Sequence, residues 1–308
     1  MLHTYQVAGH CFSIELEDHS PLWDRLENYT PFLADNCRSE ALFTVRFVDR
    51  SEPFRRVPFY MEKDAEPDQP RMEVYREALE GAPQPDFRIG SGSPRWVIEM
   101  APVQKMPICA RIVSDGGFRT AEVSAADNEK LGLFAINNAA MLLFAFNTAT
   151  KGTLEMHASV IANGGRGYLF LGKSGTGKST HSSLWLKHIA GSELLNDDNP
   201  VVRLEADGTV RVYGTPWSGK TPCYRNLSVP VGGFVRIRQH PENIIHRSGP
   251  LEAYASLYPS CSGLRPIQAW ADGMHETIGA LIASVPCYEL QCLPDEGAAR
   301  LCADTVRL

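Results

Sequence analysis

The amino-acid sequence predicts an α/β protein with a mixed sheet, preceded by an antiparallel α+β lobe. Three observations support this prediction. The first half contains short strand-like runs and one long apolar helix-like run. A glycine-rich segment then stands between an apolar run and a helix-compatible run, and the C-terminal part alternates helix-like and strand-like runs. We expect two domains, residues 1–150 and 151–308. The role considered for the domain 1–150 is substrate or partner binding.

The N-terminal lobe is expected to contain strands, one short helix and one long helix. The short helix is predicted near residues 22–28, and Ser124 is expected to cap the long helix, which ends near Ala149. Residues 51–94 carry seven prolines, which indicates a long irregular or mobile excursion. The predicted strands are 5–7, 11–16, 41–48, 96–100, 108–114 and 119–123.

Composition and charge favour a globular protein of the cytoplasm. Of 308 residues, 44% are hydrophobic and 21% charged, and the net charge of −6 argues against nucleic-acid or membrane binding. The N-terminus lacks the pattern of a signal peptide, and the apolar stretch 131–146 is expected to be a buried core helix. Eight cysteines without a C-x-x-C pair are interpreted as buried or free thiols in a reducing compartment.

The second half is expected to begin as strands and to end as alternating helices and strands. Asp207-Gly208 is a turn signal that predicts a hairpin between the runs 201–204 and 210–213. The other predicted strands are 156–162, 168–171, 193–195 and 287–291, and the predicted helices are 251–258, 267–283 and 296–305.

A phosphate-binding loop is indicated by the residues that follow the apolar run 168–171. This run ends in the pattern G-x-x-x-x-G-K-S, and helix-compatible residues follow at once. The glycines let backbone N–H groups turn towards a phosphate, and the helix N-terminus adds partial positive charge. A plain connecting loop would explain the glycines but not the lysine and serine together. The predicted nucleotide-binding residues are Gly172, Lys173, Ser174, Gly175, Thr176, Gly177, Lys178, Ser179 and Thr180.

Two of these residues have expected roles, and an acidic pair adds to them. Lys178 would reach the β- and γ-phosphates, and the Ser179 hydroxyl would coordinate Mg²⁺. Asp197 and Asp198 follow an apolar pair, and the spacing from Lys178 allows one helix, a turn and a return strand. The end of that strand would lie beside the loop, where one acid can hold the metal and the other accept a proton. The alternative is an ordinary acidic turn before Pro200.

Two further segments are candidates with open alternatives. His157 precedes the loop on an expected strand and could bind a metal or stabilise a phosphoryl oxygen, although a lone histidine there is more often a core residue. The segment 214–222 carries Trp217 and Lys220, and is either a substrate contact or a rigid connection that buries its tryptophan. Lys220 and Arg225, which follows this segment, are the candidate substrate-binding residues.

Read together, Met156-His157-Ala158-Ser159, the loop 172–180 and Asn196-Asp197-Asp198 resemble the catalytic domain of HPr kinase/phosphorylase. The set is also similar to ATP-type phosphoenolpyruvate carboxykinase, which shares that phosphate-loop fold, and a closer likeness is to HPr-kinase-related proteins. The resemblance implies that Asp197 or Asp198 contacts metal, that one of them is the general base, for which Asp198 is our choice, and that His157 is catalytic or metal-proximal. It also implies self-association.

The leading hypothesis is an ATP-dependent kinase that transfers the γ-phosphoryl group to a hydroxyl of a protein, peptide or small-molecule acceptor. Lys178, His157 and Asp198 are its predicted catalytic residues, Ser179 and Asp197 its metal ligands, and ATP with Mg²⁺ (Mn²⁺ as the second choice) its cofactors. The alternatives are a nucleotide-binding or ATP-hydrolysing regulator and a carboxykinase-like lyase.

Overall fold

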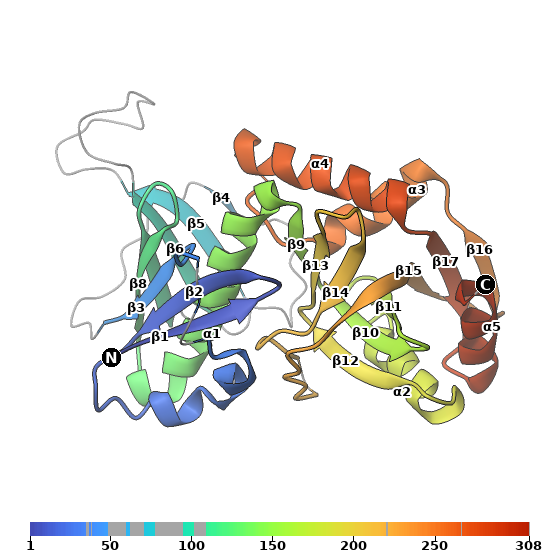
Figure 1. Cartoon of the computed structure of the whole chain (residues 1–308), viewed down its shortest axis with the longest axis horizontal. Helices are drawn as coiled ribbons and strands as arrows, with labels where there is room; N and C mark the ends of the chain where they lie inside the picture. The colour runs from blue at the N-terminus through green and yellow to red at the C-terminus, as the bar shows by residue number, and fades with distance from the viewer. Residues whose placement is uncertain are drawn as a thin grey trace. The chain divides into compact units, whose positions relative to one another are not determined.

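The structure is a computed structural model, and it describes residues 1–34, 37, 39–48, 60–61, 71–77, 95–101, 109–219, 221–265 and 267–307. The chain forms two compact units, shown in Figure 1. The first comprises Met1–Gln6 and His10–Asn147, and the second comprises Val7–Gly9 and Thr148–Leu308. Both contain mixed sheets with helices, so the protein is of the mixed α/β kind.

The first unit contains an eight-stranded sheet among its described residues. Its strand order is β1-β2-β3-β8-β7-β6-β5-β4. The strands are β1 (Leu2–Val7), β2 (His10–Glu15), β3 (Thr44–Phe47), β4 (Tyr60–Met61), β5 (Arg71–Glu77), β6 (Arg95–Ala101), β7 (Ala110–Ser114) and β8 (Thr120–Ala125).

The expected all-antiparallel pairing of this sheet is wrong at two places. β3 runs parallel to both β2 and β8, whereas β4 to β8 pair antiparallel in succession. The physical reason is the connection between β2 and β3, because residues 16–43 are long enough to return the chain to the end where β2 began. Apolar alternation predicts a strand but does not set its direction.

Two other expectations for this unit need correction. The helix predicted near 22–28 is instead a pair of 3₁₀ helices, η1 (Trp23–Arg25) and η2 (Glu27–Phe32). Pro31 lies inside η2 and has no N–H to give to an α-helical ladder. The supposed irregular excursion 51–94 contains the strands β4 and β5, and the rest of that prediction falls outside the described residues.

Helix α1 (Asn128–Thr148) is capped by Asp127 rather than by Ser124. The Asp127 carboxylate accepts the backbone N–H of Lys130 at 3.0 Å, while Ser124 lies within β8. An aspartate directly before the first helical residue can reach that N–H, and a strand residue cannot.

The long apolar helix is a core element of the first unit. Phe144 and Phe146 are buried and contact Phe12 and Phe118, with ring centroids 6.2 and 4.9 Å apart. Among the described residues, one helical stretch, Asn128–Lys151, is long and apolar enough to cross a membrane, and 61% of its apolar window is buried inside the protein.

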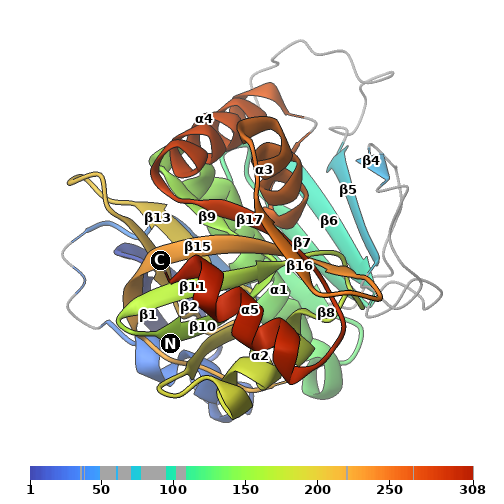
Figure 2. The ribbon, with the colours of Figure 1, turned by 90° about the vertical axis from the view of Figure 1, so that its right-hand side faces the viewer.

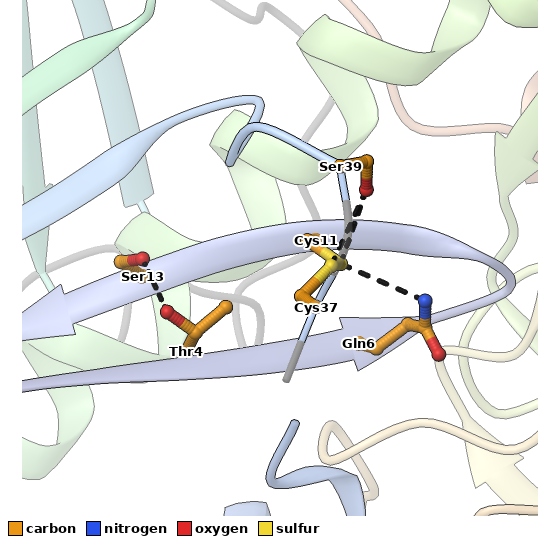
Figure 3. Close-up of a disulfide and its surroundings, with 6 residues drawn as sticks. All are labelled: Thr4, Gln6, Cys11, Ser13, Cys37 and Ser39. Atoms are coloured by element: carbon orange, nitrogen blue, oxygen red, sulfur yellow. Dashed lines mark hydrogen bonds between the residues drawn. A yellow bond between two sulfur atoms is a disulfide. The ribbon is translucent and has the colours of Figure 1, made fainter. Parts of the chain in front are cut away.

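Two of the eight cysteines form a disulfide, which corrects the expectation of thiols throughout. Cys11 on β2 is bonded to Cys37, with the Cα atoms 6.6 Å apart (Figure 3). The Cys11 sulfur also accepts hydrogen bonds from Gln6 and Ser39. The bond could not be foreseen because the two residues are 26 positions apart and approach only when β2 is paired in the sheet. The remaining six cysteines are free.

The second unit contains a nine-stranded sheet among the described residues, with the order β12-β10-β11-β15-β14-β13-β9 and with β17 and β16 beyond β15. β11 and β17 run parallel to β15, whereas β10 is antiparallel to both of its neighbours. The strands are β9 (Thr153–Glu155), β10 (Ala158–Asn163), β11 (Arg166–Leu171), β12 (Glu193–Asp198), β13 (Val201–Leu204), β14 (Val210–Tyr213), β15 (Ser228–Gln239), β16 (Ile244–Arg247) and β17 (Cys287–Cys292).

Helices cover both faces of this sheet. α2 (Lys178–His188) and α5 (Glu296–Val306) pack side by side on one face, and α3 (Pro250–Leu257) and α4 (Gln268–Ser284) pack on the other (Figure 2). The hairpin predicted at Asp207-Gly208 is confirmed, because β13 and β14 pair antiparallel from Val201 opposite Tyr213. The helices and strands thus bring the ends of β11, β12, β15 and β17 to one edge of the sheet.

Candidate functional site

The glycine-rich loop connects β11 to α2 as the sequence predicts. Gly177 precedes the first helical residue with a φ of +104°, and Gly172 has a φ of +147°. A Cβ on Gly172 would lie 2.6 Å from the Thr176 hydroxyl oxygen, so no larger residue fits there without a shift. The loop therefore depends on its glycines for both conformation and space.

Lys178 lies at the base of this loop. Its ammonium donates to the backbone carbonyl of Gly172 at 2.9 Å, and the residue is only 9% exposed. Burial lowers the pKa of Lys178, while the nearby charges of Asp198 and Asp197 raise it in opposition. The cation is thus held against the backbone at the base of the loop, within the electrostatic influence of the acidic pair.

Ser179 joins α2 to the acidic pair. Its hydroxyl donates to the Asp197 carboxylate at 2.9 Å. One turn further along α2, the hydroxyls of Ser182 and Ser159 lie 2.6 Å apart, which holds the helix against β10. Because Ser159 and Asp197 are opposite each other in the β10–β12 pair, both contacts lie on the α2 face of the sheet.

His157 pairs with the second acid, Asp198. The histidine Nδ1 lies 2.8 Å from the Asp198 Oδ1, and both side chains are partly exposed. His157 stands just before β10 rather than on it, and the pairing of Ala158 with Leu171 brings it to the edge where the loop begins. Burial alone would raise the pKa of Asp198, but the hydrogen bond and charge of His157, with Lys178 and Asn199, lower it on balance.

A short strap formed by residues 214–219 fixes the backbone of the acidic pair. The N–H of Gly219 donates to the Asp197 carbonyl at 2.6 Å, and Ser218 forms a β-bridge with Asp198. Asp198 has a φ of +144°, a conformation that L residues rarely adopt. A Cβ on Gly219 would lie 2.9 Å from the Asp197 carbonyl oxygen and 3.0 Å from the Asp198 Cβ, so only glycine fits this approach.

A buried polar network supports the same strap, and sequence reasoning missed it. Asn196 is completely buried and donates to the Thr215 hydroxyl at 3.1 Å and to the Trp217 carbonyl at 3.2 Å. The Thr215 hydroxyl donates in turn to the Asn199 carbonyl at 2.7 Å. The signal in the sequence was the Asn196-Asp197-Asp198 run followed by Gly214-Thr215-Pro216-Trp217, two segments whose contact is set only by the fold. Trp217 is buried, so it belongs to the strap itself.

Of the two candidate substrate residues, the structure describes Arg225, which does not join this cluster. Lys220 lies outside the described residues. Arg225 donates to the Leu194 carbonyl at 2.9 Å and pairs with Glu193 at 2.8 Å, near the start of β12 rather than at its end. Four residue steps along an extended strand separate Leu194 from Asp198, about 13 Å. The guanidinium therefore holds the edge of β12 and is remote from the loop.

A buried carboxylate lies close to the pair and was not anticipated. Glu155 on β9 is completely buried, and neither of its carboxylate oxygens has a hydrogen-bond partner of ordinary geometry in the described part of the chain. Burial raises the pKa of Glu155 to about 8; the Ser262 side chain lowers it and the charge of Asp198 raises it. A carboxyl group in this environment is mainly protonated at neutral pH.

The cluster offers oxygen ligands of the kind that Mg²⁺ prefers. The Ser179 hydroxyl and the Asp197 carboxylate face each other beside the loop. Mg²⁺ is held by one or two protein oxygens plus substrate phosphates in sites of this type, so these residues fit the ion. Within the described ranges, no group of three or more His, Cys, Asp or Glu side chains could hold a metal alone.

Comparisons with known proteins give only a weak fold-level similarity. No protein-family model matches the chain, and no curated protein matches its sequence. Among solved structures, the chain is similar to the Hpr(Ser) kinase/phosphatase from Coxiella burnetii, with 13% identity and a TM-score of 0.29. That similarity covers 50% of this chain and 93% of the other.

Proposed function

We propose that this protein is an ATP-dependent kinase that transfers the γ-phosphoryl group of ATP to a hydroxyl of a protein, peptide or small-molecule acceptor. One observation carries the proposal. A glycine-rich loop with its lysine, a serine–aspartate pair and a histidine–aspartate pair meet at one edge of a sheet. Phosphoryl transfer needs these parts together, because positioning and charge stabilisation supply most of its catalysis.

The nucleotide would bind with its phosphates against the loop 172–180. The N-terminus of α2 and the backbone N–H groups of the loop favour negative charge. Lys178 would then exchange its contact with the Gly172 carbonyl for the β- and γ-phosphates. The burial of Lys178 is consistent with that role, because an anionic partner stabilises the charged form of a buried ammonium group.

Ser179 and Asp197 would hold Mg²⁺, with Mn²⁺ as a second choice. When bound, the ion would neutralise charge on the phosphate oxygens during transfer. Asp197 reaches this position only because β12 ends beside the first turn of α2.

Asp198 would act as the general base and His157 would orient it. The acceptor oxygen forms a bond to the γ-phosphorus as the bond to the ADP oxygen breaks, and the hydroxyl proton passes to the Asp198 carboxylate. The lowered pKa of Asp198 keeps that carboxylate unprotonated near neutral pH. A positioned base of this kind contributes about 10²–10⁴-fold to the rate.

The test is phosphate transfer from γ-labelled Mg-ATP to hydroxyl-containing peptides and small molecules by the wild type, Lys178→Ala and Asp198→Asn. We expect Lys178→Ala to lose nucleotide binding and Asp198→Asn to bind ATP but lose transfer. Equal transfer by the wild type and Asp198→Asn would remove Asp198 as the base. ATP binding or hydrolysis without transfer to any acceptor would favour a nucleotide-dependent regulator, and oxaloacetate-dependent ATP consumption would favour a lyase.

A further inference from the structure

One row of paired residues crosses the second sheet at the level of the loop. Asp198 is opposite Ala158, Ala158 is opposite Leu171, and Leu171 is opposite Arg236. Leu171 is the residue directly before Gly172, so the loop begins between Asp198 and Arg236. Three inter-strand spacings separate these two, about 14 Å between their backbones.

Arg236 lies on the α3 face of the sheet. Phe234, two residues earlier on β15, packs in the core cluster that includes α3 and α4, together with Ala158 and Leu171. Val235 and Ile237 pack on the opposite face with α2 and α5. Side chains alternate along a strand, so Arg236 shares the face of Phe234. Its contact with the Ser256 hydroxyl of α3, at 3.5 Å, agrees with that direction.

The carboxylate next to Arg236 is already engaged by other groups. Glu289 is opposite Arg236 in the β15–β17 pair, yet it forms its ion pair with Arg238 at 2.8 Å. Its other oxygen accepts a hydrogen bond from Gln291 at 3.0 Å. In the part of the chain that the structure describes, the one side-chain hydrogen bond of Arg236 is the long contact to Ser256. Most of its guanidinium donors therefore remain available to a ligand.

The Ser256 hydroxyl is itself held in place. It donates to the Glu252 carbonyl at 2.8 Å within α3, and Ser256 is 6% exposed. Its oxygen is thus directed to accept from Arg236. This contact orients a half-buried arginine beside the start of the loop without neutralising its charge.

We propose that Arg236 anchors an anionic group of the phosphoacceptor, so that the acceptor is a small hydroxylated anion such as a hydroxy acid. The inference rests on the proposed kinase function. A guanidinium binds a carboxylate through two parallel hydrogen bonds, which fixes orientation as well as position. With its anion at Arg236, the acceptor extends past the strand ends, outside the buried Leu171 and Ala158, towards Asp198 and presents its hydroxyl near the γ-phosphate.

Other hydrogen-bond donors of the protein are placed to bind the nucleotide phosphates. We therefore assign the anion at Arg236 to the acceptor. The loop N–H groups, Lys178 and the N-terminus of α2 serve the phosphates, and α2 lies on the opposite face of the sheet from Arg236. Arg236 shares its face with Ala158 and is aligned with Asp198, the proposed base.

The test is calorimetric titration of the wild type, Arg236→Gln and Arg236→Lys, each first saturated with Mg-AMPPNP, with D-glycerate as the probe. Glycerol serves as the uncharged control ligand, and Arg300→Gln as the control variant, because Arg300 is paired with Glu296 on α5, on the opposite face of the sheet. We expect glycerate but not glycerol to bind the wild type. Arg236→Gln should weaken glycerate binding at least 10-fold, Arg236→Lys less, and Arg300→Gln less than 2-fold.

Four results would overturn the inference. The first two are no glycerate binding to the wild-type complex and equal glycerate binding by wild type and Arg236→Gln. The third is a matching loss with Arg300→Gln. The fourth is a loss of AMPPNP affinity in Arg236→Gln, which would assign Arg236 to the nucleotide. If AMPPNP does not bind to the wild type, the kinase proposal itself is overturned, and this outcome is distinct from the four above. Titration of the nucleotide-free protein with glycerate would still test Arg236 in that case.

Discussion

The Ser179 hydroxyl on α2 donates a hydrogen bond to the Asp197 carboxylate at the end of β12, over 2.9 Å. The two residues are 18 positions apart and come from different elements. Two oxygen ligands therefore stand together only because the return strand β12 ends beside the first turn of the helix that follows the loop.

Replacing Asp197 should weaken metal-dependent nucleotide binding. Asp197→Asn keeps the shape and the hydrogen bond from Ser179 but removes the charge that attracts Mg²⁺. We expect the Mg²⁺ concentration that gives half-maximal ATP affinity to rise at least 10-fold, measured by ATP titration at several Mg²⁺ concentrations. Asp304→Asn, at an exposed carboxylate on α5, is the control and should change nothing. An unchanged Mg²⁺ requirement in Asp197→Asn would exclude Asp197 as a metal ligand.

Removing the His157 imidazole should move the acid side of the pH profile. Burial raises the pKa of Asp198 and the hydrogen bond from His157 lowers it, so His157→Asn leaves the raising effect less opposed. The base works as a carboxylate, and a higher pKa means that it is protonated sooner as the pH falls. The acid limb of kcat/KM should therefore shift to higher pH.

The control for this prediction is His188→Asn. His188 pairs with Glu296 at 3.3 Å, which is another histidine–carboxylate pair on the same unit, and it is the last residue of α2, at the opposite end of that helix from the loop. It should leave the acid limb in place. A wild-type profile in His157→Asn would show that His157 does not govern the ionisation of Asp198.

Gly219→Ala should displace the acidic pair. The new Cβ would lie 2.9 Å from the Asp197 carbonyl oxygen, closer than real Cβ contacts allow, and 3.0 Å from the Asp198 Cβ, which is tighter than most. We expect kcat to fall at least 10-fold while ATP affinity falls less, because the loop itself is untouched. Gly249→Ala is the matched control, since a Cβ there meets nothing within 4 Å. Equal kcat in the two variants would mean that the strap residues shift to accommodate the new methyl group and that Asp198 keeps its position.

Local pattern predicted the loop and its neighbours well. The apolar run, the glycines and the Lys178-Ser179 pair lie in consecutive residues, and β11, the loop and α2 occupy the expected positions. Strand β15 was missed because Pro230, Gly232 and Gly233 disfavour a strand when read locally. It is stabilised by pairing with strands on both sides, which sequence periodicity does not show.

Contacts between distant segments could not be predicted. The strap on Asp197 and the register row that brings Arg236 level with Leu171 depend on the fold. Arg225 was favoured as a substrate residue because it follows the strap in the chain, yet it turns to Glu193 at the other end of β12. Nearness in sequence to a site did not decide which arginine lies beside it.

The disulfide should reduce the number of titratable thiols and stabilise the first unit. Denatured, unreduced protein should show six thiols rather than eight, because Cys11 and Cys37 are bonded. Closing a loop of 26 residues is worth about 3–4 kcal/mol in the chain-entropy model. Reduction or Cys11→Ser should lower the melting temperature, and Cys223→Ser should remove one thiol without that loss. Eight thiols before reduction would disprove the bond.

Glu155→Gln should stabilise the protein increasingly as the pH rises. The pKa of Glu155 is 4.5 in its ordinary state and about 8 when buried in the fold. Between these values the folded state binds one more proton than the unfolded state, so wild-type stability falls with rising pH by up to about 1.4 kcal/mol per pH unit. Below pH 4.5 both states are protonated and the group contributes nothing, and above pH 8 the full loss has been reached.

Glutamine has nearly the shape of protonated glutamate and cannot ionise, so the variant avoids this loss. Urea unfolding of wild type and Glu155→Gln at pH 5, 6, 7 and 8 measures the effect as a difference that grows with pH. Glu242→Gln, at an exposed position, should show a small difference that does not change with pH. A difference for Glu155→Gln that does not change with pH would mean that the buried carboxyl is already ionised in the folded protein. A cation or water outside the described side chains would then stabilise that carboxylate near Asp198.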